Sequence, residues 1–270
     1  MADLAARDAA RALAGLQVLV TRPRHQSAPL AALIDAHGGT AIRFPVIDIV
    51  APQDSRAARA VMAKLDDYSL VIFVSPNAVE HGLALMNTPP TRARMVAVGE
   101  SSASALEQAG LGPVLRPAEG ASSEALLALP ELGEDAVAGS RVLIVRGEGG
   151  RQLLGGTLCK RGARVTYAEV YRRALPEVDV SGIAERGRAG EIDTVIVTSL
   201  QGLDNLFDML GDGDTAWLRE TGYVVISERL ATHARALGIK EPPVVAARAD
   251  DDALVEALIR WRKAHPNDRK

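Results

Sequence analysis

The fold is decided by a run of sequence that occurs twice. Residues 142–146 read Val-Leu-Ile-Val-Arg, and residues 18–22 read Val-Leu-Val-Thr-Arg. Two further pairs keep the same or nearly the same offset, residues 71–75 with 195–199 and residues 96–100 with 224–228. A duplication of this kind is typical of two similar lobes. Because ligands often bind in clefts between domains, the repeat also indicates where a ligand would bind.

Short apolar runs extend this pattern along the chain. They begin near residues 17, 70, 95, 141, 194 and 223, and a helical pattern follows each one. Runs that are apolar on both faces are typical of buried strands in a parallel sheet covered by helices. Strands that alternate with helices in this way predict an α/β protein.

Residues at the ends of helices refine the prediction. Ser27 is predicted to cap a helix over residues 28–36, and Ser75, followed by proline, is predicted to cap another. The only cysteine, Cys159, is predicted to be a small core residue of a helix. We expect a loose helix over residues 1–14 and a frayed end over residues 261–270.

Two segments that end at a proline differ from the buried strands. Residues 43–52 read Arg-Phe-Pro-Val-Ile-Asp-Ile-Val-Ala-Pro, and residues 167–176 occupy the matching place in the second copy. Proline is disfavoured at central positions of a sheet. We therefore predict that both segments are extended connectors at the sheet edges, which together form a two-strand hinge between the lobes.

Length and composition limit the functional classes. The chain has 270 residues, of which 47% are hydrophobic, enough for two ordered domains. A net charge of −3 and 3% aromatic residues argue against a nucleic-acid partner. No apolar run approaches the roughly 18 residues that cross a bilayer, and no secretory signal is evident. With a single cysteine, we expect a monomeric cytoplasmic protein that binds neither nucleic acid nor membrane.

The turns after the six strands hold the candidate ligand-binding residues, because parallel sheets bind ligands beyond the carboxyl ends of their strands. These turns are small, hydroxylated or basic, and helix N-termini attract anions. We predict that they bind carboxylates or phosphates, with arginine assisting. For the serines the alternative is simple helix capping, and for the arginines it is solvated surface charge. The candidates are Arg22, Ser75, Asn77, Gly99, Ser101, Ser102, Arg146, Gly147, Arg151, Thr198 and Ser199.

Motifs for cofactors and metals do not occur. The cluster that begins at Gly147 has Gln152 where a dinucleotide fingerprint needs glycine, and no phosphate-binding loop ends in Gly-Lys-Ser/Thr. The five histidines lack the spacing of metal ligands. We therefore expect no cofactor and no metal. Tyr171 is either a half-buried strand tyrosine or a phenol that donates a proton to a leaving group.

Several of these segments resemble one family. Residues 20–23 (Val-Thr-Arg-Pro), 74–79 (Val-Ser-Pro-Asn-Ala-Val) and 98–103 (Val-Gly-Glu-Ser-Ser-Ala) are similar to turns of the uroporphyrinogen-III synthase family. So are Arg146-Gly147 with Arg151 and Leu154, and the Val-Tyr pair that ends at Tyr171. The resemblance covers about residues 17–260. The turn at Ser227 departs from the family pattern, because Leu230 stands where a threonine is common.

This resemblance implies an architecture that the repeat leaves open. It implies two flavodoxin-like lobes with parallel sheets joined by a two-strand connector. The first lobe is expected to combine residues 1–44 with 173–270, and the second to span residues 50–168. Residues 43–52 and 167–176 are the expected connectors.

The resemblance also implies a reaction in tetrapyrrole and heme biosynthesis. The substrate is expected to be hydroxymethylbilane, which a lyase of this family dehydrates and cyclises to uroporphyrinogen III with inversion of ring D. No cofactor is needed, Tyr171 is the expected proton donor, and transient contact with hydroxymethylbilane synthase is expected. Two alternatives remain open: a non-catalytic two-lobed protein that binds a small anion, and a regulatory relative that has lost activity.

Overall fold

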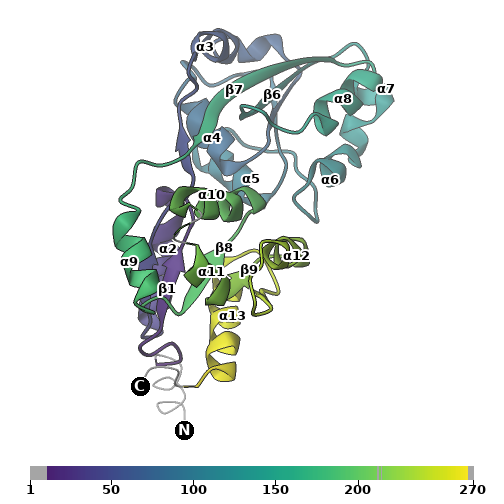
Figure 1. Ribbon diagram of the computed structural model, residues 1–270. Helices are drawn as coiled ribbons and strands as arrows, with labels where there is room; N and C mark the ends of the chain where they lie inside the picture. The colour runs from purple at the N-terminus through teal and green to yellow at the C-terminus, as the bar shows by residue number, and fades with distance from the viewer. Residues whose placement is uncertain (1–10, 212, 214, 267–270) are drawn as a thin grey trace. The chain divides into compact units, whose positions relative to one another are not determined.

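The computed structural model describes residues 11–211, 213 and 215–266, and they divide into two compact units (Figure 1). Unit 1 contains the described residues up to Asp48 and those from Ala174 onward. Unit 2 is continuous from Ile49 to Arg173. The chain therefore passes between the units twice, and each unit is described by itself below.

Unit 1 is built on a five-stranded parallel sheet with the order β10-β9-β8-β1-β2. Its strands are β1 (Gln17–Val20), β2 (Thr40–Arg43), β8 (Thr194–Val197), β9 (Gly222–Val225) and β10 (Val244–Val245). Counted in chain order within the unit, this is the 2-1-3-4-5 order of flavodoxin-like sheets.

Helices cover both faces of this sheet. Val18, Val20 and Val224 pack against α2 (Arg24–Ala36) and α13 (Asp251–Ala264). Leu19 and Val195 point to the opposite face and are fully buried, so that face is covered as well. The remaining helices of the unit are α9 (Ser181–Arg188), α10 (Leu200–Leu210), α11 (Ala216–Glu220) and α12 (Glu228–Ala236).

Unit 2 repeats the arrangement with its strands in a different chain order. Its sheet has the order β3-β7-β6-β4-β5, and Leu115 forms a parallel bridge with Val96 of β5 at the far edge. The strands are β3 (Asp48–Val50), β4 (Leu70–Phe73), β5 (Arg94–Ala97), β6 (Arg141–Gly147) and β7 (Arg164–Ala174). From β7 to the bridge the order is again 2-1-3-4-5, if β6 is counted first. The repeated runs therefore occupy equivalent places in the two units, although the sequence halves are not the units.

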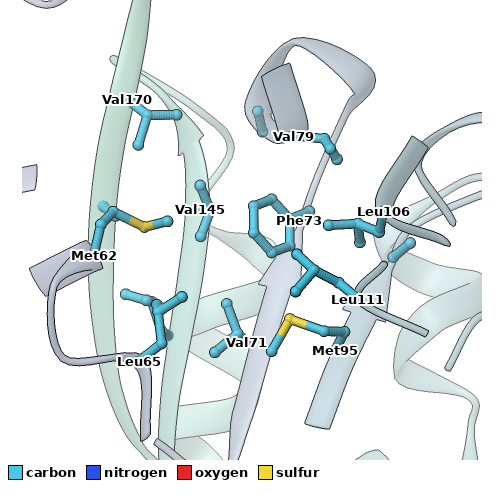
Figure 2. Packing of buried hydrophobic residues seen from close by; sticks show 14 of the residues in the cluster. Met62, Leu65, Val71, Phe73, Val79, Met95, Leu106, Leu111, Val145 and Val170 are labelled. Atoms are coloured by element: carbon cyan, nitrogen blue, oxygen red, sulfur yellow. The ribbon is translucent and has the colours of Figure 1, made fainter. Parts of the chain in front are cut away.

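Alternate residues of the central strands face opposite layers in unit 2. Val71, Phe73 and Val145 pack toward α3 (Arg56–Met62), α4 (Pro76–Leu83), α5 (Glu100–Gln108) and the short helix η1 (Leu65–Asp67). Figure 2 shows Phe73 among Val145, Val79 and Leu106 in this layer. The intervening side chains, such as Ile72 and Ile144, pack toward α6 (Ser123–Leu127), η2 (Pro130–Leu132), α7 (Glu134–Val137) and α8 (Leu153–Lys160). The strand period of two thus gives a helix–sheet–helix sandwich.

The six predicted strands are confirmed as β1, β4, β5, β6, β8 and β9. The predicted cap Ser75 is also confirmed, because its side chain accepts a hydrogen bond from the Ala78 N–H. The prediction for Ser27 is wrong, since α2 begins one turn earlier, directly after Pro23. A proline has a φ angle already suited to a helix start, and Ser27 instead lies buried inside the helix and donates to the Arg24 carbonyl.

The predicted edge position of residues 167–176 is wrong. This segment lies mostly within β7, an eleven-residue strand between β3 and β6. Its proline, Pro176, stands beyond the end of the strand, so it removes no hydrogen bond from the sheet. Residues 43–52 do contribute the edge strand β3.

Three further predictions concern single segments. Cys159 is exposed, because the buried face of α8 is formed by Leu154, Gly155 and Leu158 instead. Trp261 is not frayed: it lies in α13, is 7% exposed and donates to Glu241. The predicted helix over residues 1–14 lies mostly outside the described residues, and residues 11–15 form a turn.

Candidate functional site

The carboxyl ends of three neighbouring strands in unit 2, β4, β6 and β7, border a pocket of about 420 Å³. Five of the residues predicted from the sequence line it: Ser75, Arg146, Gly147, Arg151 and Tyr171. The other lining residues are Val74, Val98, Ala121, Ser122, Ser123, Ile144, Glu148, Gly149, Gly150, Leu154 and Arg173. The pocket lining mixes apolar side chains with basic and hydroxyl groups, as small-molecule sites commonly do.

A bulge in β7 sets the position of Tyr171. Strand β6 pairs with β7 in regular register until Arg146 meets Glu169, and then Gly147 meets Tyr171 instead of Val170. An extra residue of this kind turns two neighbouring side chains toward the same side. Val170 and Tyr171 accordingly pack in the same apolar cluster, and Tyr171 is only 4% exposed.

Gly147 provides the space that the Tyr171 ring occupies. A Cβ atom at residue 147 would lie 2.5 Å from Cε2 of Tyr171 and 2.6 Å from its Cζ, closer than such atoms approach. The next residue, Glu148, donates its backbone N–H to the Tyr171 carbonyl at 2.8 Å. The glycine is therefore required by a close approach to an aromatic ring, and the turn is joined directly to β7.

Ser75 joins a helix cap to the Tyr171 phenol. Its Oγ accepts from the Ala78 N–H at 3.1 Å and lies 3.3 Å from the Tyr171 hydroxyl. Ser75 therefore both caps a helix and belongs to the candidate site. The His81 ring also lies near the phenol, 5.7 Å from the Tyr171 ring, centroid to centroid.

The Arg146 guanidinium is engaged within the unit. Nη1 donates to the Gly150 carbonyl at 3.1 Å and Nη2 to Glu169 Oε1 at 2.9 Å. The guanidinium carbon lies 3.9 Å above the centre of the Tyr167 ring. The side chain is 8% exposed, so the charge is both paired and largely removed from water.

Basic side chains at the rim are more accessible. Arg151 is 71% exposed and pairs with Glu124 in the first turn of α6 at 3.0 Å. The hydrogen bond within Glu124 to its own backbone, and then that from Arg151, lower the pKa of the Glu124 carboxyl. Arg173 also lines the pocket, and none of the ion pairs among the described residues involves it. Sequence reasoning missed Arg173, although alternation along a strand places it two residues beyond Tyr171 on the same side.

The other predicted residues of unit 2 do not line the pocket. Asn77 lies in the first turn of α4, and Ser101 and Ser102 lie in the first turn of α5, where Ser102 is buried. Gly99 precedes α5 and lies against a pocket residue, because a Cβ there would be 2.6 Å from that of Ala121.

Three predicted residues belong to unit 1, at the carboxyl ends of β1 and β8. Arg22 forms an ion pair with Asp251, in the first turn of α13. Thr198 and Ser199 follow β8, and Ser199 caps α10 by accepting from the Gly202 N–H at 3.0 Å.

Two kinds of feature do not occur in the part of the chain that the structure describes. It contains no group of three or more His, Cys, Asp or Glu side chains placed to hold a metal ion. None of its helices combines the length and the apolarity that crossing a bilayer requires.

Fold and pocket together define an α/β protein with two flavodoxin-like units and a polar pocket at the strand ends of unit 2. Comparison with known families then assigns it. A family model described as "Uroporphyrinogen-III synthase HemD" matches residues 28–256, and the chain therefore belongs to the uroporphyrinogen-III synthase family.

Curated relatives agree with this assignment. The chain is 36% identical over 248 residues to the uroporphyrinogen-III synthase of Salmonella typhimurium, which covers 90% of this chain and 100% of the relative. The identity and both coverages are the same for the Escherichia coli uroporphyrinogen-III synthase.

Solved structures agree on the fold. A mutant uroporphyrinogen III synthase from the extremely thermophilic bacterium Thermus thermophilus superposes with a TM-score of 0.59 at 20% identity, covering 93% of this chain and 100% of that one. The synthetase from Helicobacter pylori gives a TM-score of 0.61 at 16% identity, covering 92% and 100%.

Proposed function

We propose that the protein is a lyase that cyclises and dehydrates hydroxymethylbilane to uroporphyrinogen III. The observation that carries this proposal is the buried phenol of Tyr171, held in a pocket at the strand ends between Ser75 and the Gly147 turn. Membership of the uroporphyrinogen-III synthase family supports the substrate class.

The reaction requires that the protein donate one proton and hold the substrate in one conformation. The pyrrole nitrogen next to the terminal hydroxymethyl group supplies electrons as the C–O bond breaks, and the leaving hydroxide takes a proton to depart as water. Tyr171 is the proposed donor of that proton, because its hydroxyl is the acidic group of a buried side chain that lines the pocket. The substituted carbon of the last pyrrole attacks the methylene of the resulting azafulvene cation and gives a spiro intermediate. The older bond from that carbon to its methylene bridge then breaks, the bridge bonds to the free α carbon of the same ring, which is thereby inverted, and that α carbon loses its proton.

Selecting that carbon is a matter of positioning. The substrate carries eight carboxylates, and the N-termini of α4 and α5 offer backbone N–H groups to such anions. In unit 2 the proposed binding residues are Ser75, Asn77, Gly99, Ser101, Ser102, Gly147 and Arg151. In unit 1 they are Arg22, Thr198 and Ser199. Because binding is spread over many contacts, we expect no single one of them to be indispensable.

A coupled assay tests the reaction. Hydroxymethylbilane is generated in place by its own synthase, this protein is added, and the oxidised products are separated by chromatography. Uncatalysed closure gives the type I isomer, so a shift to type III supports the proposal. Type I alone from folded protein contradicts it and favours a non-catalytic binder of small anions. The same assay, with and without an excess of catalytically silent bilane synthase, tests the proposed transient contact.

Tyr171→Phe tests the proton donor. We expect kcat to fall by about 10²-fold, within the usual contribution of general acid catalysis, and stability to fall by only about 1 kcal/mol. Tyr68→Phe is the matched control, because Tyr68 is a second buried tyrosine of the same apolar cluster and does not line the pocket. An unchanged kcat for Tyr171→Phe would contradict the proton-donor role of Tyr171. It would not contradict the proposed reaction, which is tested by type III formation in the wild type.

A further inference from the structure

Every nitrogen of the Arg146 guanidinium is either engaged or covered. Nη1 donates to the Gly150 carbonyl and, at 3.5 Å, to that of Arg151. Nη2 donates to Glu169, and Nε is buried without a hydrogen-bond partner among the described residues. Three of the five guanidinium N–H groups thus have partners within the unit, and at 8% exposure the side chain offers little surface to an incoming carboxylate.

The groups that hold Arg146 come from two directions. Glu169 lies opposite Arg146 on the neighbouring strand β7 and pairs with its charge. The ring of Tyr167, two residues earlier on the same strand, lies against the flat face of the guanidinium. The Tyr167 hydroxyl donates to Gln152 at 3.2 Å, which joins the ring to the residue before α8.

Arg146 itself holds the glycine-rich turn over residues 147–151. Its guanidinium fixes the carbonyls at the far end of the turn, while the near end is fixed by the Glu148 N–H on the Tyr171 carbonyl. Gly149 within this turn has a positive φ of 69°, and Gly150 is also free of a side chain. A turn with so few internal restraints depends on such external hydrogen bonds for a single shape.

We propose that Arg146, Glu169 and Tyr167 form a clamp that positions the 147–151 turn for the substrate. Arg146 is then a positioning residue, and the recognition of substrate carboxylates at this strand end falls to the backbone N–H groups of the turn that it holds. This proposal rests on the proposed function. It deepens that function by separating the groups that bind the substrate from the residue that positions them.

Glu169→Ala distinguishes the clamp from direct binding by the sign of its effect. If Arg146 itself bound a substrate carboxylate, removal of the competing Glu169 carboxylate would free its charge and lower KM. If Arg146 positions the turn, the same change loosens the clamp, and we expect KM to rise roughly fivefold with a smaller change in kcat. Glu169→Gln keeps an acceptor for Nη2 and is expected to restore most of the wild-type KM.

Arg161→Met is the matched control. Arg161 also uses Nη1 to hold two backbone carbonyls of unit 2, those of Leu127 at 2.8 Å and Leu132 at 2.7 Å, and none of these three residues lines the pocket. Its loss is expected to reduce thermal stability without moving KM. A KM shift equal to that of Glu169→Ala would show that general destabilisation explains both, and would overturn the clamp.

Amide hydrogen exchange provides a readout that needs no catalysis. Exchange of the Glu148 amide, which donates to the Tyr171 carbonyl, is expected to accelerate about tenfold in Glu169→Ala and to stay at the wild-type rate in Arg161→Met. Unchanged exchange, or a KM that stays level or falls in Glu169→Ala, overturns the proposal. If the wild type formed no type III isomer, the proposed function would fail by that assay alone, whereas the exchange rates would still decide whether Arg146 holds the turn. Should Glu169→Ala fail to fold, Glu169→Gln carries both measurements, with smaller shifts in the same directions.

Discussion

Arg22 and Arg146 occupy the same place in the two copies of the repeat, and the two units use them differently. Arg22 follows strand β1 of unit 1, and Arg146 lies at the carboxyl end of strand β6 of unit 2. Arg146 is committed to two carbonyls, one carboxylate and an aromatic ring of its own unit. Among the described residues Arg22 has one carboxylate partner, Asp251, and its side chain is 12% exposed.

The difference lies in what surrounds each strand end. The carboxylate and the ring that hold Arg146, those of Glu169 and Tyr167, come from β7, the strand paired with β6, and its two carbonyl partners come from the turn after β6. The partner of Arg22 comes from α13, a helix outside the repeated runs. A duplicated position therefore fixes where a side chain begins, and the residues around it decide whether it supports the backbone or remains available to a ligand.

The residue after each arginine gives the largest expected effect. Unit 2 has Gly147 there and unit 1 has Pro23. Gly147→Ala places a methyl group where the Tyr171 ring lies, and we expect kcat/KM to fall about 10²-fold because the ring must move by about an ångström. Steady-state kinetics with a thermal melt measures it. Gly156→Ala is the control, since a Cβ there has nothing within 4 Å, and a tolerated Gly147→Ala would disprove the close-approach argument.

Freeing Arg22 should have an effect opposite in sign to disturbing Arg146. In Asp251→Asn the Arg22 charge loses its competitor, so we expect KM to fall about twofold, whereas Glu169→Ala raises it. Asp252→Asn is the control, because Asp252 lies in the same first turn of α13 and has no ion pair with Arg22. If KM rose in Asp251→Asn as well, the two arginines would share one role and the contrast would be lost.

A comparison of two buried tyrosines, one in each unit, gives the smallest expected effect. Unlike Tyr171, Tyr223 has a hydroxyl with no hydrogen-bond partner among the described residues, and it is fully buried in β9 of unit 1. Tyr223→Phe removes an unsatisfied polar atom and is expected to raise the free energy of unfolding by about 1 kcal/mol, with unchanged kinetics. Urea unfolding measures the gain, and a loss of stability would show that the hydroxyl has a partner.

The same residue predicts a pH dependence. Burial raises the pKa of the Tyr223 phenol above its ordinary value of 10.0, with Arg219 opposing the shift. The folded protein therefore holds this proton more tightly than the unfolded chain does. Its contribution to stability is complete below pH 10 and declines as the pH rises beyond it. Unfolding measured between pH 8 and about pH 11 should show a steeper alkaline decline in the wild type than in Tyr223→Phe.

Much of this architecture could be predicted from local sequence. The six apolar runs are strands because burial on both faces leaves a signal within a few residues, and Ser75 is a cap because its partner, Ala78, is three residues away. The central position of β7 was missed, because Pro176 lies beyond the strand and gives the same local signal as a proline within it. The division of the chain into lobes followed from the family resemblance, since the repeat alone fits several connections.

For the candidate site, too, some features could be predicted from the sequence and others could not. The rule that ligands bind at strand ends found Ser75 and Gly147, and Tyr171 was found as a polar aromatic residue of a predicted connector; all three line the pocket. It could not show that Arg146 is satisfied by Glu169, because that pairing depends on the register between two strands. The pairing of Arg22 with Asp251 joins opposite ends of the chain and leaves no local trace in the sequence.

The double passage of the chain has a consequence for how the protein is made. Strands β1 and β2 leave the ribosome before unit 2, yet β1 must wait for β8, its neighbour in the sheet, until all of unit 2 has been synthesised. Unit 2 is continuous, and the strands β3 and β7 at its two ends are neighbours in its sheet. Once unit 2 folds, it draws the ends of a long intervening loop together and removes most of the entropy cost of closing it. Nascent chains should therefore acquire protease resistance first in the middle of the sequence, with both flanks still susceptible.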